Sequence, residues 1–415
     1  VLFTTPHSLT HLKLDMNAGI KVFVTDISTI FGPDQNYPFD DPARATRLET
    51  VIFAQPGSDP GLTFSPEEGA NLQYTGGTTG RSKGAILSHR NLIANAVQTR
   101  HWFKNVYNDG EASFLSVIPL FHIFGLTSAM NFPIISGSAI LLHFKFDLPE
   151  MIRIIEKYKP NLFMGIPAMY AAFVMRQEHP DLSSIRACIS GSAPLPLAIQ
   201  QKFEQLTGGK LVEGYGLSEA SPVVTCNPVY GVVKNGSIGL PFPDTEVKIV
   251  NPQDGSEILT PGEIGELLVK GPQVMKGYWE QPEETTQTLQ NGWLHTGDLV
   301  RMDEEGYISI TDRLKDMIIT GGEKIYPREV EELLYKHPAV KEVAVIGVPH
   351  PLRGEVAGAY VVLKEDTTAD ERELKHYCAE HLTKYKVPHT FKFVDALPRS
   401  SVGKILKQVL RESVK

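Results

Sequence analysis

The chain has 415 residues, 42% hydrophobic and 21% charged, and its 40 Lys and Arg against 48 Asp and Glu give a formal charge of −8. This composition is typical of a globular protein with a large core, which excludes a disulfide-stapled mini-protein and a disordered tail. A net acidic chain is also a poor general binder of nucleic acid. The three cysteines are too few and too widely spaced for a disulfide framework, and they indicate a reducing, cytoplasmic location.

The chain starts at Val1, where the first residues lack the charged-then-apolar order of a signal or transit peptide. Because no initiator methionine precedes this residue, we expect the sequence to be a fragment.

Apolar runs and helical stretches alternate through the first three quarters of the chain. Strands are expected at residues 20–24, 161–165 and 185–189, and helices at 148–157 and 198–206. This alternation predicts an α/β fold, with a large layered domain built on parallel strands.

An uncharged stretch covers residues 112–144. Its length would allow a helix that spans a membrane, but prolines, glycines and two histidines interrupt it. We therefore interpret it as a buried strand–helix–strand unit with strands at 114–118 and 139–142, and any membrane contact would be peripheral.

Short strands separated by turns replace this pattern after about residue 230. They are expected at 246–250, 264–270 and 307–311, which predicts a β-rich subdomain over about 230–312. The large domain is therefore expected to cover residues 1–312.

A charged segment at 312–316 starts a new cycle of elements. Helices are expected at 327–337 and 371–382, and strands at 343–348 and 357–363. We expect a small, mobile C-terminal α+β domain over 313–415. Its last 32 residues hold eight Lys and Arg against two Asp and Glu, and a solvated helix face is their simplest explanation.

The sharpest local feature runs from Tyr74 to Ala85 and reads Tyr-Thr-Gly-Gly-Thr-Thr-Gly-Arg-Ser-Lys-Gly-Ala. Glycines allow successive N–H groups to converge on phosphate oxygens, while the threonine hydroxyls and Lys83 add donors and a positive charge. The segment is not a Walker A loop, because its lysine precedes glycine rather than Ser or Thr.

Two other chemistries are weaker candidates. The chain has no Gly-x-Ser-x-Gly elbow, so a serine hydrolase is disfavoured. His376, Cys378 and His381 have a spacing that could suit zinc, but Cys378 shares a helical face with Leu374 and is expected in the core.

Three single residues could carry chemistry and could equally be structural. His122 follows an apolar strand, where a histidine is usually a hydrogen-bonded core residue. Asp298 ends a tight turn and could accept ribose hydroxyls, or cap the turn. Glu219 could bind Mg²⁺ through its oxygens, or be solvated.

The order of these features resembles that of the adenylate-forming enzymes, the acyl-CoA synthetase superfamily, and is most similar to the fatty-acid–CoA ligases. The resemblance covers residues 70–412. Its motifs are the Gly/Thr/Lys loop, Phe121-His122, Gly191-Ser-Ala-Pro194, Tyr215-Gly-Leu-Ser-Glu219, Trp293 to Asp298, Asp312-Arg-Leu-Lys315, Gly321-Gly322, Tyr326 to Glu331 and Pro398 to Lys404.

The resemblance implies an enzyme, an AMP-forming ligase that makes carbon–sulfur bonds. A carboxylic acid reacts with ATP to give an acyl-adenylate and pyrophosphate. The expected acid is a medium- or long-chain fatty acid. Coenzyme A then displaces AMP. The implied cofactors and cosubstrates are ATP, Mg²⁺ and coenzyme A.

The resemblance also implies a role for each matching residue. The implied catalytic residues are Lys404, His122 and Thr79, and Lys315 is the implied hinge. The implied ATP- or AMP-binding residues are Thr75, Gly76, Gly77, Thr78, Thr79, Gly80, Lys83, Gly191, Ser192, Ala193, Pro194, Gly214, Tyr215, Gly216, Ser218, Asp298, Arg313 and Lys404. The implied acyl pocket consists of Phe121, His122, Gly125, Gly191 and Gly216. Gly321 and Gly322 would contact coenzyme A, and Thr75 and Glu219 would hold the metal.

Two alternatives stay open. The family's large domain normally begins well upstream of the phosphate loop, so the chain could bind nucleotide or acyl-adenylate yet turn over poorly. It could also be a fatty acyl-AMP ligase that loads a carrier protein. Aromatic acids and a homodimer are further options that the sequence does not decide.

Overall fold

The computed structural model describes residues 61–75, 82–143, 145–178, 180–399 and 405–413, together with the backbone of three short strands nearer the N-terminus. The chain divides into two compact units, Val1–Phe64 and Ser65–Lys415. The described strands of the first unit form a parallel sheet in the order β1-β2-β3. They are β1 (Leu2–Thr4), β2 (Val22–Val24) and β3 (Thr46–Arg47).

A seven-stranded sheet is the centre of the second unit, in the order β12-β11-β10-β9-β8-β6-β7. The five strands from β10 to β7 are parallel, which confirms the predicted arrangement, while β11 and β12 are antiparallel additions. The bounds are β6 (Ser113–Ser116), β7 (Ala139–Leu142), β8 (Leu162–Gly165), β9 (Ala187–Ser190), β10 (Lys210–Gly216), β11 (Val223–Cys226) and β12 (Leu240–Pro241).

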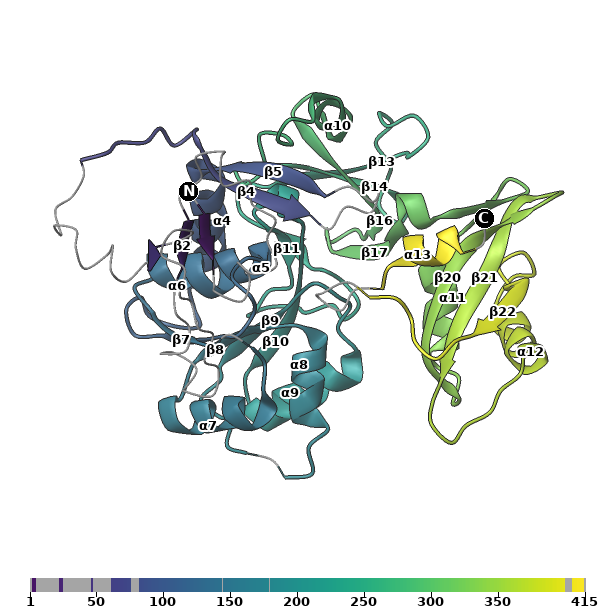
Figure 1. Ribbon diagram of the computed structural model, residues 1–415, viewed down its shortest axis with the longest axis horizontal. Helices are drawn as coiled ribbons and strands as arrows, with labels where there is room; N and C mark the ends of the chain where they lie inside the picture. The colour runs from purple at the N-terminus through teal and green to yellow at the C-terminus, as the bar shows by residue number, and fades with distance from the viewer. Residues whose placement is uncertain are drawn as a thin grey trace. The chain divides into compact units, whose positions relative to one another are not determined.

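Helices cover both faces of this sheet (Figure 1). Successive residues of β8 point to opposite faces, so Leu162 joins the core beneath one set of helices and Phe163 the core beneath the other. One face carries α7 (Leu148–Tyr158), α8 (Pro167–Val174) and α9 (Leu197–Thr207). The other carries α4 (His89–Trp102), α5 (Ile123–Leu126) and α6 (Phe132–Ile135).

The helix starts follow from local sequence. Ser88 and Asn91 form a reciprocal capping box at the start of α4, and Asp147 accepts the N–H of Glu150 at the start of α7. The predicted helices at 148–157 and 198–206 are confirmed by α7 and α9, because apolar side chains recur there at helical spacing.

The uncharged stretch forms a strand–helix–strand unit, as predicted, with β6, the α5–α6 region and β7 in succession. The prediction that the unit is buried is wrong in part. β7 lies at the edge of the sheet, where Leu142 is 60% exposed, and Phe121 is 74% exposed. Among the described residues, no helix is both long and apolar enough to cross a bilayer.

A second sheet follows the predicted β-rich pattern and is antiparallel throughout. The prediction placed two of its strands at their observed bounds and the third within a few residues. Its members are β13 (Glu246–Val250), β14 (Ile264–Lys270), β15 (Leu289–Gln290), β16 (Trp293–Met302) and β17 (Ile308–Arg313), with α10 (Pro282–Thr288) before β15. A separate hairpin consists of β4 (Gly69–Thr75) and β5 (Lys83–Ser88).

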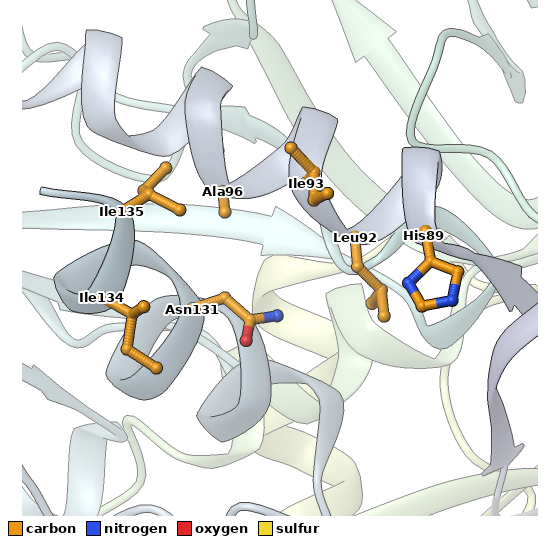
Figure 2. Close-up of a pocket in the computed structure, with 7 residues that line it drawn as sticks. All are labelled: His89, Leu92, Ile93, Ala96, Asn131, Ile134 and Ile135. Carbon is orange, nitrogen blue, oxygen red and sulfur yellow. The ribbon is translucent and has the colours of Figure 1, made fainter. Parts of the chain in front are cut away.

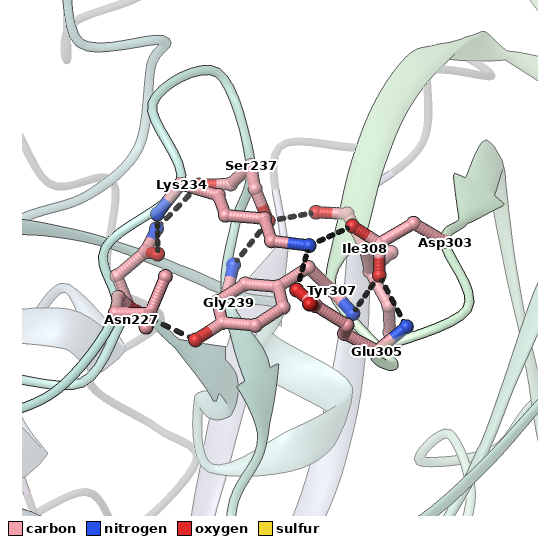
Figure 3. Close-up of polar contacts among 9 residues, drawn as sticks. Asn227, Lys234, Ser237, Gly239, Asp303, Glu305, Tyr307 and Ile308 are labelled. Atoms are coloured by element: carbon pink, nitrogen blue, oxygen red, sulfur yellow. Dashed lines mark hydrogen bonds and ion pairs between the residues drawn. The ribbon is translucent and has the colours of Figure 1, made fainter.

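The turn of the β16–β17 hairpin is held against the loop between β11 and β12 (Figure 3). Lys234 in this loop pairs with Asp303 at 2.5 Å and with Glu305, and its ammonium lies 4.6 Å from the ring centroid of Tyr307. The hydroxyl of Ser237 donates to the carbonyl of Ile308 at 2.7 Å. These contacts tie the hairpin to the strands that follow β10.

The C-terminal part contains a third sheet, in the order β19-β18-β21-β20 with β22 beside β21. Cys378 is fully buried in its core, which confirms the core assignment. The elements are β18 (Ile318–Thr320), β19 (Glu323–Ile325), α11 (Pro327–Leu334), β20 (Val340–His350), β21 (Gly354–Leu363), α12 (Glu371–His381), β22 (Thr390–Phe393) and α13 (Lys407–Glu412).

The second sheet ends at Arg313 and the third begins at Ile318. A 3₁₀ turn, η4 (Leu314–Asp316), joins them, and the domain boundary at 312/313 stays a prediction. The interpretation of the basic C-terminal residues as a solvated helix face is wrong for Lys407, which is ion-paired with Glu331 and whose side chain is only 16% exposed.

Candidate active site

Three residues from three different strands meet at Asp298 in the middle of β16, where Tyr215 comes from β10 and Arg313 from β17. The Nε of Arg313 lies 2.9 Å from Oδ1 of Asp298, and the hydroxyl of Tyr215 donates to Oδ2 at 2.6 Å. Asp298 is 3% exposed, so its charge is compensated almost entirely by these two partners. Each carboxylate oxygen keeps a lone pair that could accept a further hydroxyl.

The electrostatics of this trio follow from burial. Burial and the neighbouring Asp298 raise the pKa of Tyr215 well above its usual value, so the phenol stays a donor. Burial alone would lower the pKa of Arg313, but Asp298 and the other acidic groups around it together outweigh burial, and the net shift is upward. The trio is therefore a fixed carboxylate between a neutral donor and a permanent cation.

The prediction that a tight turn ends at Asp298 is wrong, because residues 293–302 form the single strand β16, with a register shift against β14 and a left-handed φ of 68° at Gly297. This irregular part of the strand is held by a residue that sequence reasoning missed. Glu266 on β14 is 6% exposed; its Oε1 accepts the N–H of Gly297 at 3.0 Å, and its Oε2 lies 3.0 Å from Nδ1 of His295. The hydroxyl of Thr296 accepts the N–H of Asp298 at 3.1 Å. Glu266 therefore positions the backbone that carries Asp298, and only the β14–β16 register could have revealed it.

The predicted phosphate loop joins β4 and β5. Thr75 and Lys83 are opposite each other in this hairpin, so the structure brings the two ends of the loop together. The predicted loop residues between them lie outside the described residues: Gly76, Gly77, Thr78, Thr79 and Gly80.

Lys83 is paired with Glu284 on α10, and its ammonium lies 5.1 Å from the ring centroid of Tyr278. The Tyr278 hydroxyl donates to Oε1 of Glu219 at 2.7 Å. Burial and Glu219 raise the pKa of this phenol, so it remains a donor. Tyr278 therefore links the lysine to the predicted metal ligand, a connection that sequence reasoning missed.

The glycine-rich segments lie at the ends of β9 and β10. Gly191 follows β9 against the ring of Phe124, and Ser192 has a left-handed φ of 69°. Gly214 lies within β10. A Cβ on Gly216 would come 2.1 Å from the carbonyl oxygen of Pro222, so no larger residue fits there.

The residues of the predicted acyl pocket are only partly gathered. Phe121 lines a groove of about 600 Å³ together with Leu72, Tyr74, Leu92 and Leu126. His122, Gly125, Gly191 and Gly216 do not line it.

His122 and Gly125 have local structural roles. His122 caps α5 by accepting the N–H of Phe124 at 3.3 Å, and burial lowers its pKa. A Cβ on Gly125 would come 2.4 Å from the carbonyl oxygen of Pro119, so this glycine permits a close backbone contact.

A second, smaller groove of about 220 Å³ lies between α4 and α6. Figure 2 shows its lining, in which isoleucines from both helices face the space and His89 stands at one end. It shares Leu92 and Asn131 with the first groove. No site residue was predicted there.

Four further predicted residues belong to the C-terminal part. Lys315 lies in η4, and Gly321 and Gly322 form the turn between β18 and β19 with φ of 59° and 91°. Added Cβ atoms at these two glycines would meet nothing within 4 Å, so the turn is open. Lys404 lies outside the described residues.

Two family models match the chain. Residues 14–279 match the AMP-binding enzyme, and residues 329–404 match the AMP-binding enzyme C-terminal domain. Since the first match alone covers more than half of the chain, the chain belongs to the AMP-binding enzyme family, the adenylate-forming enzymes that its motifs resemble.

Individual relatives agree with this membership. A long-chain-fatty-acid–CoA ligase of Bacillus subtilis (strain 168) is 52% identical over 345 residues, which are 83% of this chain and 61% of that protein. The chain thus spans about three fifths of the length of this curated relative.

Solved structures match more of the chain and confirm the fold class. ATP-bound MatB from Rhodopseudomonas palustris has a TM-score of 0.84 and 33% identity over 99% of this chain and 82% of that chain. The o-succinylbenzoate CoA synthetase of Bacillus subtilis, in complex with its acyl-adenylate intermediate, has a TM-score of 0.81 and 31% identity over 98% of this chain and 81% of that chain.

Proposed function

We propose that the protein activates a carboxylic acid with ATP through an acyl-adenylate and transfers the acyl group to coenzyme A. The observation that carries the proposal is the trio of Tyr215, Asp298 and Arg313, because all three were predicted to bind the nucleotide and Asp298 contacts both of the others. The named fatty-acid ligase at 52% identity and the ATP-bound and adenylate-bound neighbours support the same reaction.

In this proposal Asp298 accepts the ribose hydroxyls, and Arg313 holds the carboxylate in place. The segments Gly191–Pro194 and Gly214–Ser218 line the adenine side of the nucleotide. The positions of both segments, at the ends of the neighbouring parallel strands β9 and β10, support this, because ligands in such sheets bind beyond the carboxyl ends of the strands.

The triphosphate would lie along the loop from Thr75 to Lys83. The donor set fits Mg²⁺, since Thr75 offers a hydroxyl and Glu219 a carboxylate, both hard oxygen ligands. Bound Mg²⁺ would neutralise phosphate charge. Lys83 exchanges its contact with Glu284 for phosphate oxygens, and Tyr278 keeps Glu219 oriented.

In adenylation, an oxygen of the substrate carboxylate bonds to the α-phosphorus as the bond to the pyrophosphate oxygen breaks. Lys404 would stabilise the negative charge that develops at the α-phosphate. Thr79 would contact the phosphates, and His122 would lie beside the substrate carboxylate. In the second step the thiol sulfur of coenzyme A bonds to the acyl carbon, AMP leaves, and the thiol proton is released.

The second step needs different groups at the same place. We propose that residues 313–415 form a small domain that turns at Lys315 and brings Gly321 and Gly322 to the thiol arm of coenzyme A. No atom lies within 4 Å of a Cβ added at either glycine, and this open space supports the proposal that a ligand can bind beside the turn.

For the acid, we propose a medium- or long-chain fatty acid. The groove beside Phe121 is lined mainly by apolar side chains, together with the amides Asn71, Gln73 and Asn131, and this supports the class because each methylene that leaves water contributes about 0.8 kcal/mol. We also propose a cytoplasmic location, which is supported by three buried, unpaired cysteines.

The test is a panel of octanoate, laurate, palmitate and benzoate with ATP and Mg²⁺, in which pyrophosphate release and acyl-CoA formation are measured separately. Both products are expected with at least one fatty acid. Pyrophosphate without thioester would favour transfer to a carrier protein, and no pyrophosphate with any acid would reject the proposal.

A further inference from the structure

The segment that contains Lys404 is closed at its base. Residues 400–404 lie outside the described residues, but Arg399 and Ile405 on either side form an antiparallel bridge. The N–H of Leu406 also donates to the carbonyl of Pro398 at 2.8 Å. Helix α13 begins at Lys407, directly after Leu406. The position of α13 therefore determines where the paired residues Arg399 and Ile405 lie.

Helix α13 is anchored in the C-terminal part by one apolar and one ionic contact. Leu410 is 7% exposed within an apolar cluster on β20 and β21. The Nζ of Lys407 lies 2.7 Å from Oε1 of Glu331 on α11, an oxygen that also accepts the N–H of Val345 at 2.6 Å. Both side chains of the ion pair are about 15% exposed, so removing one partner leaves the other charge poorly solvated.

The same helix reaches the hinge. Arg411 lies one turn after Lys407, and its Nη2 is 2.6 Å from Oδ1 of Asp316, the residue that follows Lys315. Burial alone would raise the pKa of Asp316, but the hydrogen bond from Arg411 and the charge of Lys407 outweigh it, so the pKa is lowered. The carboxylate of Asp316 is therefore held ionised by α13.

A further carboxylate, Asp312, lies on the other side of Lys315. It is 5% exposed and accepts the N–H groups of Arg313 at 2.7 Å and Arg328 at 2.8 Å. The charge of Lys407 acts on this group too and opposes the effect of burial on its pKa.

We propose that α13 couples the hinge to the segment that carries Lys404, with Lys407 and Arg411 as positioning residues. The proposal rests on the proposed function, in which Lys404 acts in adenylation and the chain turns at Lys315. The pair between Arg411 and Asp316 moves with the C-terminal part, so a turn of the hinge moves the base of the lysine segment with it.

The test variant is Arg411→Met, which keeps the aliphatic bulk and removes the charge. We expect the rate constant of adenylation to fall about tenfold through misplacement of Lys404, with the KM for ATP unchanged within about twofold. Thioester formation from supplied acyl-adenylate should stay within about twofold of wild type. Arg411→Lys, which keeps the charge, should recover at least half of the lost rate.

A matched control is Gln408→Met, because Gln408 lies on the same helix and contacts only its neighbour Glu412 among the described contacts. It should leave both half-reactions unchanged. Hydrogen–deuterium exchange measures how firmly α13 is held and does not depend on enzyme activity. The amides of residues 405–413 should exchange faster in Arg411→Met than in wild type, and at the wild-type rate in the control.

An adenylation rate in Arg411→Met equal to that of wild type would overturn the coupling. An equal loss of rate in both half-reactions would also overturn it, because it would indicate that Arg411 has only a structural role. A wild-type protein that releases no pyrophosphate rejects the proposed function and the coupling with it. Hydrogen exchange would then still show whether Arg411 anchors α13.

Discussion

Asp298 and Arg313 face each other across the β16–β17 pair, and the Nε of Arg313 lies 2.9 Å from Oδ1 of Asp298. The ladder between the two strands sets this distance, while Tyr215 on β10 fixes the second carboxylate oxygen. A ribose at this carboxylate would meet an acceptor whose orientation is already determined. Binding would therefore lose little conformational entropy of the Asp298 side chain.

Asp298→Asn should weaken nucleotide binding by at least about tenfold. The change leaves Arg313 without its buried counter-charge and puts an amide donor where Tyr215 also donates. Titration with ATP and with AMP measures the affinity. Glu304→Gln, an exposed acid-to-amide change in the turn of the same hairpin, is the control and should bind normally. Equal affinities in the two variants would contradict the ribose assignment.

Glu266→Gln should raise the KM for ATP about three- to tenfold and change kcat less. The amide can still accept the N–H of Gly297, but it loses the charge that orients His295. Because Glu266 acts through the strand backbone just before Asp298, the double variant with Asp298→Asn should lose less than the sum of the two free-energy changes. Strict additivity would show that Glu266 does not act through Asp298.

The free energy of unfolding should decline between about pH 4.5 and pH 7 because of Glu213. Burial raises the pKa of Glu213 to about 7, although Arg328 and a backbone hydrogen bond oppose the shift. In this range the unfolded chain loses the proton while the folded chain keeps it, so folding becomes less favourable as pH rises, by up to about 3 kcal/mol.

Glu213→Gln should flatten that dependence. Urea unfolding of wild type and variant at several pH values between 4.5 and 8 gives the difference, which isolates Glu213 from other titrating groups. The same slope in both proteins would be evidence against a raised pKa.

Lys404→Ala should slow adenylation at least about a hundredfold, since it removes a cation from the charge that develops at the α-phosphate. Thioester formation from supplied acyl-adenylate should largely survive. Lys384→Ala removes an exposed lysine from the same basic segment and serves as the control. An equal loss in both half-reactions would disprove the assignment of Lys404 to the first step.

Lys234→Met should lower the free energy of unfolding slightly, because it removes two ion pairs and a cation–π contact at the surface. If the contacts of Figure 3 also steady the hairpin that carries Asp298, ATP affinity should fall about twofold. Chemical denaturation and ATP titration check the two effects separately. An unchanged unfolding midpoint would show that the network adds no stability.

The amino-acid sequence determined the local elements and the order of the motifs. Strands such as β13 and β14 were predicted at their observed bounds because side-chain alternation and flanking turns act over a few residues. The glycine-rich loop, the segment that ends at Asp298 and the charged segment 312–316 were recognisable for the same reason, since each motif consists of consecutive residues.

Only the tertiary structure decided which distant groups became partners. Tyr215 and Asp298 are 83 positions apart, and Lys83 and Glu284 are 201 apart, so no local pattern links them. The contacts of Glu266 and Tyr278, and the contact of α13 with Asp316, depend on strand register and on which faces are buried. These are set by packing of the whole chain, because ion pairs and hydrogen bonds strengthen only where burial has removed water.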